Sequence, residues 1–183
     1  GGNSSKGLAG SGLAVRGGGL VNSAGRLITA QGGNSSAGGA ADKSIGGDGI
    51  HVSETMDNNT SKLSAYSFDN YGTINATGGS GSAGGGSGGN GMRGSRWYRW
   101  QDSMPQSLGR LSNHAGASMN FYGGASAGSG QGGHGLQGEN GVMENRGNLR
   151  FAGSDTSAGS TGAHGGNTFN YALINNGGGI IFQ

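Results

Sequence analysis

The sequence predicts an all-β repeat fold, a β-solenoid (β-helix) of about five coils with Gly-rich returns between them. Two observations about composition lead to this prediction. Gly accounts for 47 of the 183 residues and hydrophobic types for only 31%, which is too little bulky apolar surface for one ordinary globular core. Disordered chains usually combine such compositions with high net charge and abundant Pro, whereas this chain has a net charge of +2 and a single Pro. The third observation is an internal repeat.

Five units, each starting in a Gly-rich segment, make up one repeat domain that spans 1–183. The second and third units are about half as long again as the others, and we assign their extra residues to insertions at 53–67 and 95–109. Stacked copies can bury apolar faces that one unit cannot bury alone, which favours a solenoid. The units are 1–31, 32–77, 78–122, 123–152 and 153–183.

Two landmarks recur in the same order in the units. The first is a Gly-Gly-x-Gly-apolar step, clearest at 46–50, 88–92 and 132–136 and looser at 10–13 and 165–169. The second is an apolar-x-Asn turn that leads into a short strand. Asn and Gly tolerate the left-handed backbone that sharp corners need. The turn residues, which we expect to form a hydrogen-bonded ladder along the stack, are Asn22, Asn70, Asn113, Asn145 and Asn175.

Each unit is expected to contain a strand pair around this turn, followed by a Gly-rich return. The alternation Ile74-x-Ala76 and Leu149-x-Phe151 places apolar side chains on one strand face. Coils spaced by about 4.8 Å would make a stack about 24 Å tall. The returns, such as 78–91, are interpreted either as flexible loops, or as extended polyglycine-II-like segments packed side by side, or as local disorder.

The two ends of the chain are at the same phase of the repeat. Joining Ile181, Phe182 and Gln183 to Gly1 and Gly2 reproduces the internal junction at 31–33. One hypothesis is that these residues are assembly ends of a head-to-tail homopolymer. Another is that the chain is an excised piece whose partners are contiguous repeats of a longer chain, and a third is a chance match. The first residues do not combine a positively charged segment with an apolar one, so we expect no signal peptide.

Several function classes have little support in the sequence. Cys is absent, the Gly-x-Ser-x-Gly matches at 85–89 and 124–128 are expected by chance, and the position where a calcium repeat has Asp carries His51, Arg93 or Gln137. The four His residues are assigned to different repeat phases and interpreted as isolated and exposed. We therefore expect no enzyme activity, metal or cofactor. The few charges and short apolar stretches predict neither nucleic-acid binding nor membrane insertion.

The second insertion contains the most distinctive residue cluster of the chain. Within five positions it has both Trp residues, two Arg and a Tyr, the types that dominate interface hot spots. The alternative interpretation is that the cluster folds over its own loop. The candidate contact surface consists of Arg96, Trp97, Tyr98, Arg99 and Trp100.

The segments at 20–25, 29–33, 46–50 and 71–79 resemble passenger-domain repeats of large bacterial autotransporter and filamentous-haemagglutinin-like adhesins. This resemblance implies a secreted or surface-displayed right-handed β-helix with a spacer or adhesive role. A weaker resemblance is to Gly-rich tail-fibre adhesins of phages, where polyglycine-II-type helices pack into a sandwich. Together with the repeat, these likenesses predict a non-enzymatic extracellular fibre subunit or surface stalk. The alternative is an adhesin or phage-type receptor-binding module that contacts a cell surface or glycan through Arg96–Trp100.

Overall fold

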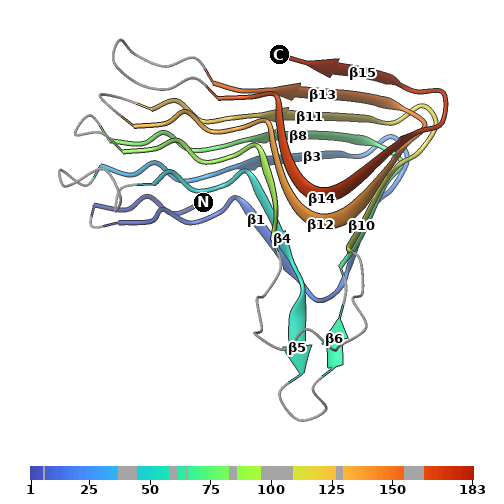
Figure 1. The fold of residues 1–183 in the computed structure, drawn as a ribbon, viewed down its shortest axis with the longest axis horizontal. Coiled ribbons are helices and arrows are strands. Elements are labelled where there is room, and N and C mark those ends of the chain that lie inside the picture. The colour runs from blue at the N-terminus through green and yellow to red at the C-terminus, as the bar shows by residue number, and fades with distance from the viewer. Residues whose placement is uncertain are drawn as a thin grey trace.

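The described part of the chain is all-β, and a computed structural model shows how its segments stack. Parallel pairing joins equivalent strands of successive coils, which confirms the predicted solenoid of about five coils (Figure 1). The strands in chain order are β1 Leu13–Arg16, β2 Gly19–Asn22, β3 Leu27–Gln31, β4 Ile50–Ser53, β5 Thr55–Asp57, β6 Lys62–Ser64, β7 Ser67–Asn70, β8 Thr73–Thr77, β9 Met92–Ser95, β10 Gly109–Asn113, β11 Ser118–Tyr122, β12 Leu136–Asn145, β13 Asn148–Ala152, β14 Gly166–Asn175 and β15 Gly179–Phe182. The structure describes residues 1–5, 7–36, 45–57, 62–64, 66–82, 86–95, 109–126, 130–154 and 163–183.

Each coil contains three strand positions, and the coils are named by them. Coil 1 is β1–β2–β3, coil 2 is β4–β7–β8 and coil 3 is β9–β10–β11. In coil 4 the long strand β12 occupies the first two positions before β13, and in coil 5 β14 does so before β15. The strand that follows the Gly-Gly-x-Gly step was not anticipated from the sequence. Its inward alternation is clear in Leu13-x-Val15 and Ile50-x-Val52, but Gly94 and Gly138 replace the second apolar residue in coils 3 and 4.

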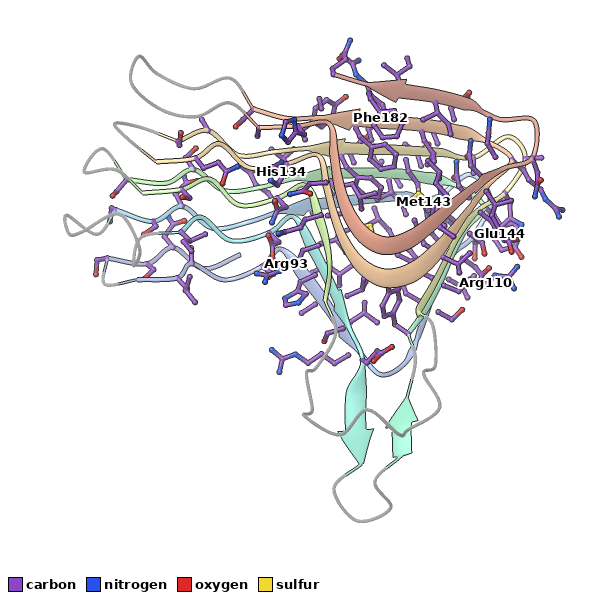
Figure 2. The ribbon with its side chains drawn as sticks, in the orientation of Figure 1. Arg93, Arg110, His134, Met143, Glu144 and Phe182 are labelled. Carbon is purple, nitrogen blue, oxygen red and sulfur yellow. The ribbon has the colours of Figure 1, made fainter. Side chains whose placement is uncertain are left out.

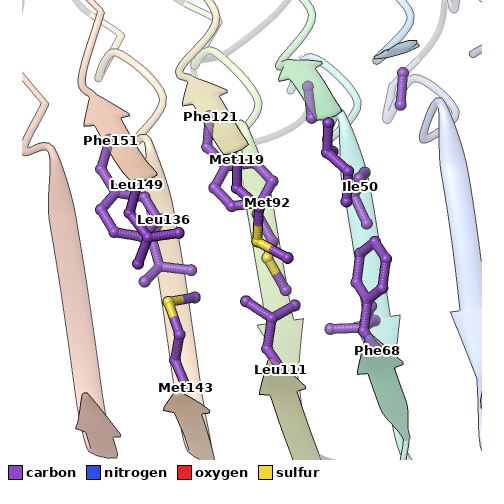
Figure 3. Close-up of a cluster of buried hydrophobic side chains, with 14 of the residues drawn as sticks. Ile50, Phe68, Met92, Leu111, Met119, Phe121, Leu136, Met143, Leu149 and Phe151 are labelled. Carbon is purple, nitrogen blue, oxygen red and sulfur yellow. The ribbon is translucent and has the colours of Figure 1, made fainter. Parts of the chain in front are cut away.

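The core consists of inward-facing columns that run along the stack (Figure 3). Ile50, Met92 and Leu136 form one column, and each is at most 3% exposed. A second column ends in three aromatic rings: Phe121 and Phe151 lie 5.7 Å apart between ring centroids, and Phe182 follows at 5.2 Å. The stack therefore buries apolar side chains coil against coil instead of around one centre.

The turns that follow the aligned asparagines differ in length from coil to coil. Coils 1 and 3 place four residues between the strands, and coils 2 and 4 place two. The longer turns use a left-handed glycine, with φ of +70° at Gly25 and +78° at Gly116. Side chains other than Gly are strained in this conformation. Turn length can therefore vary while the strands on both sides remain in register.

The described residues of the Gly-rich segments form a layer beside the strands, on the left in Figure 1. Their described residues, which we call the glycine slab, are 1–5, 7–12, 32–36, 45–49, 78–82, 86–91, 123–126, 130–135, 153–154 and 163–165. Backbone hydrogen bonds of 2.7–3.1 Å join segments that leave a coil to segments that return. The N–H donors run in one direction, each donating to the carbonyl of the residue before it in the series Gly2, Gly10, Gly33, Gly47, Gly79, Gly89, Gly124, Gly133 and Ser154. These described parts therefore pack side by side through backbone hydrogen bonds.

Side chains are excluded where the backbones of neighbouring slab segments contact one another. A Cβ atom at Gly33, Gly47, Gly79, Gly89 or Gly124 would collide with backbone atoms of a neighbouring segment. Backbone cannot yield as a flexible side chain can, so only Gly fits at these positions. The high Gly content is thus a packing requirement of the slab.

Candidate functional site

Both insertions leave the solenoid at the same corner. The first connects β4 to β7 and forms the antiparallel hairpin β5–β6, which projects at the bottom of Figure 1. The second, at 95–109, begins at the last residue of β9 and ends at the first residue of β10. In parallel pairing β9 lies beside β4, and β10 lies beside β7. Arg96–Trp100, the predicted contact surface, lie outside the described residues.

The base of the first insertion belongs to the core. Glu54 and Tyr66 are each only 2% exposed. The Tyr66 ring occupies the space where a Cβ of Gly109 would lie, and its hydroxyl would be 3.1 Å from a Cβ of Gly94. Because Gly94 and Gly109 of coil 3 have no side chains, there is room for this ring. Of the described residues in segment 53–67, those of β5 and β6 extend away from the stack.

The five predicted turn asparagines lie one above another and form an asparagine ladder. Asn22 Nδ2 donates to Asn70 Oδ1 at 2.8 Å, and Asn70 donates to Asn113 at 2.9 Å. The same 2.9 Å bond continues from Asn113 to Asn145 and from Asn145 to Asn175. The amides also donate to strand carbonyls, such as Thr73 and Ser118. Every step runs in the same direction, so the ladder has a polarity.

A second polar ladder lies at the x position of the Gly-Gly-x-Gly step. Asp48 Oδ1 accepts the backbone N–H of Asn90 at 3.0 Å, and Asn90 Oδ1 accepts that of His134 at 3.1 Å. His134 Nδ1 accepts the backbone N–H of His164, also at 3.1 Å. In each step a side chain of one coil holds the backbone of the next. The recurring x position was visible in the sequence, but its shared role was not, because Asp, Asn and His have different side chains.

The expectation that the histidines are isolated and exposed is wrong for His134. Its ring stacks on His164, with centroids 5.6 Å apart and planes inclined by 2°. His134 is only 6% exposed. Burial and then the neighbouring His164 ring lower the pKa of His134. The loose copy of the step in the fifth unit concealed that these two residues share one repeat phase.

A groove of about 420 Å³ runs beside the polar ladder, where the glycine slab meets the first strands of the coils. Arg93 and His134 mark its position in Figure 2. Its polar lining includes Asp48, His51 and Gln137, and Leu8 and Ile45 contribute apolar surface. Burial lowers the pKa of His51, Asp48 opposes this shift and the Arg93 and Arg16 charges reinforce it. The groove combines hydrogen-bonding groups with both signs of charge.

The predicted assembly ends lie on opposite sides of the stack. Gly1 and Gly2 belong to a segment below 32–36, where Ser4 and Ser35 form a parallel bridge. At the other end Phe182 is 54% exposed and continues the inward aromatic column, whereas Ile181, 52% exposed, faces outward. The Gln183 backbone N–H donates to the Phe151 carbonyl at 2.9 Å.

The residues that the structure describes contain no group of three or more His, Cys, Asp or Glu that could hold a metal ion. Within the same residues, no helix is long and apolar enough to cross a membrane.

Comparison with known proteins identifies no relative. No protein-family model matches the chain, and neither a curated protein nor a solved structure matches it significantly.

Proposed function

We propose that this chain is a non-enzymatic, extracellular structural repeat protein whose coils stack head to tail in a fibre or a surface stalk. The observation that carries the proposal is the common polarity of the asparagine ladder across all five coils. A further coil of the same orientation would continue this ladder, whereas a reversed coil would bring two donors or two acceptors together. The partner is therefore either a second copy or contiguous repeats of a longer chain.

Apolar side chains at the outer coils support the same proposal. In coil 1, Leu20 and Ile28 are only partly buried, whereas their counterparts in coil 2, Phe68 and Ile74, are at most 1% exposed. In coil 5, Phe182 is half exposed on top of buried Phe151. A stacked coil would cover these inward-facing groups, with about 25 cal/mol gained for each Å² of apolar surface removed from water. Pairing with the open strand edges adds backbone hydrogen bonds.

Electron microscopy combined with sedimentation over a range of concentrations tests stacking between copies. The expected result is rods with an axial repeat near 24 Å, the height of five coils. Phe182→Asp, which places a charge in the inward column, is expected to abolish the rods. Ile181→Asp is the matched control because Ile181 is equally exposed but faces outward. A monomer at every concentration, or equal effects of both variants, would contradict head-to-tail stacking of copies.

A second candidate function is an adhesin or receptor-binding module. The observation that favours it is that both insertions leave adjacent coils at the same corner. Binding of the purified chain to cells and to immobilised glycans, compared with a Trp97→Ala/Trp100→Ala variant, tests it. Binding lost while the fold and any rods are retained would support this function. Equal binding, or none by either protein, would argue against it.

A further inference from the structure

The polar ladder changes its chemistry at its upper end. Its lower steps use side-chain oxygens of Asp48 and Asn90 as hydrogen-bond acceptors. The upper step uses His134, the one side-chain type that ordinarily changes its charge between pH 5 and 8. The group that His134 holds, the His164 N–H, lies two residues before the start of β14. The first strand of coil 5 is therefore anchored through an imidazole.

Geometry defines the protonation state that this anchor requires. A backbone N–H can donate to His134 Nδ1 only when this nitrogen carries no proton, so the neutral ring must carry its proton on Nε2. Nε2 lies 3.3 Å from Asn167 Nδ2 on β14. Because Nε2–H and an amide NH2 are both donors, a second hydrogen bond to coil 5 forms only when the Asn167 amide is turned over to present Oδ1. Protonation of Nδ1 would place two N–H donors against each other.

We propose that His134 is a proton-operated joint that fastens coil 5 to coil 4 when neutral and releases the His164 backbone when protonated. The surroundings favour this behaviour. The His164 ring is stacked on the His134 ring, with centroids 5.6 Å apart, and the Asn90 amide oxygen accepts the His134 backbone N–H. The charged and titratable described groups of the adjoining groove are Asp48, His51 and Arg93, which belong to coils 2 and 3.

The direction of the pH effect follows from linkage. Burial lowers the pKa of His134 from its usual value of 6.5, so folding favours the neutral ring. The stabilisation is complete above pH 6.5 and is lost as the pH falls below it through the lowered pKa of the folded state. Because the loss concerns one hydrogen-bonded step, we expect local opening around 163–167, with the lower coils unaffected.

Amide hydrogen exchange by NMR tests the joint, and the ladder supplies an internal control. The protection of the His164 N–H is expected to fall about two- to tenfold between pH 7.5 and 4.5, the range that one net hydrogen bond gives. Protection of the His134 N–H, held by non-titrating Asn90, is expected to remain constant after correction for intrinsic exchange. Nitrogen chemical shifts should show the Nε2–H tautomer of His134 at neutral pH.

Substitution provides the matched control. His134→Asn gives coil 4 the residue that coil 3 uses at the same position, so the variant is expected to fold and to hold the His164 N–H at both pH values. His134→Ala should lose the protection at both. A His134 ring that titrates while His164 protection is unchanged would overturn the proposal. The proposal would also be overturned if His134→Asn retained the wild-type pH response, or if the neutral His134 ring were in the Nδ1–H tautomer.

One consequence rests on the proposed function. If coil 5 carries a stacking surface, rods should shorten in mild acid, and His134→Asn should restore their length. The two ideas fail separately. Absence of rods at neutral pH would contradict stacking, whereas the exchange measurement on the unassembled chain judges the joint alone.

Discussion

The strands and the glycine slab belong to the same coils but are stabilised in opposite ways. In the strands, apolar side chains such as Phe121 and Leu149 are almost completely buried. In the slab, the absence of side chains lets backbones approach until each segment bonds to its neighbours. One region gains from burying apolar area, and the other depends on hydrogen bonds and on the close approach that only Gly permits. A substitution that is conservative in one region is therefore disruptive in the other.

The largest effect is expected in the strand core. Phe121→Ala removes the ring between Ala76 and Phe151 and leaves a cavity that its stacked neighbours cannot fill. The free energy of unfolding should fall by about 3–5 kcal/mol, measured by chemical denaturation. Phe182→Ala, in the same column but half exposed, should cost less than half as much. Equal costs would mean that the column is not packed as described.

The second-largest effect on stability is expected in the glycine slab. Gly89→Ala adds one methyl group, which would collide with the Gly46 and Gly47 carbonyls. We expect a loss of about 3 kcal/mol of unfolding free energy. Gly2→Ala is the control, because a Cβ there meets nothing within 4 Å, and it should change stability by less than about 0.5 kcal/mol. If Gly89→Ala is as harmless as the control, the slab segments are not in close contact.

A smaller effect is expected at the asparagine ladder, between the core and the turns. Asn113→Ala removes its bonds to Asn70 and Asn145 and leaves buried polar atoms without these partners. Thermal or denaturant unfolding should show a loss of about 2 kcal/mol. Asn120→Ala is the control, because it breaks the similar Asn120–Asn75 bond on the outer, partly exposed face. If Asn120→Ala lowered the free energy of unfolding as much as Asn113→Ala, burial would not be the reason for the effect of Asn113→Ala.

The smallest effect is expected on the outer surface of the strands. Arg110 and Glu144 form a 2.8 Å ion pair in which the Arg side chain is 58% exposed. Arg110→Ala should lower stability by about 0.5 kcal/mol or less, and added salt should reduce the difference. A large, salt-independent loss would show that Arg110 contributes through packing instead.

The stack and its asparagine ladder could be predicted because the same residue type recurs at the turn of each unit. Asn70 and Asn113, for example, follow the same apolar-x pattern. The polar ladder could not be predicted, because its hydrogen-bond acceptors belong to different residue types: Asp48, Asn90 and His134. Order in the Gly-rich segments also remained open, since a Gly run is compatible with both a flexible loop and a packed slab. Contacts between segments decide this, and single-sequence patterns do not contain them. Arg96–Trp100 remains a prediction.

Native-state hydrogen exchange of the slab glycines tests the central claim most directly, namely that the slab is an ordered part of the stack. The N–H groups of Gly47, Gly79, Gly89 and Gly124 all donate across the slab. Their protection is expected to approach that of strand amides in β8 and β11, because opening them requires separating packed segments. Exchange at the rate of an unstructured chain would contradict the account and show that the Gly-rich segments are flexible returns.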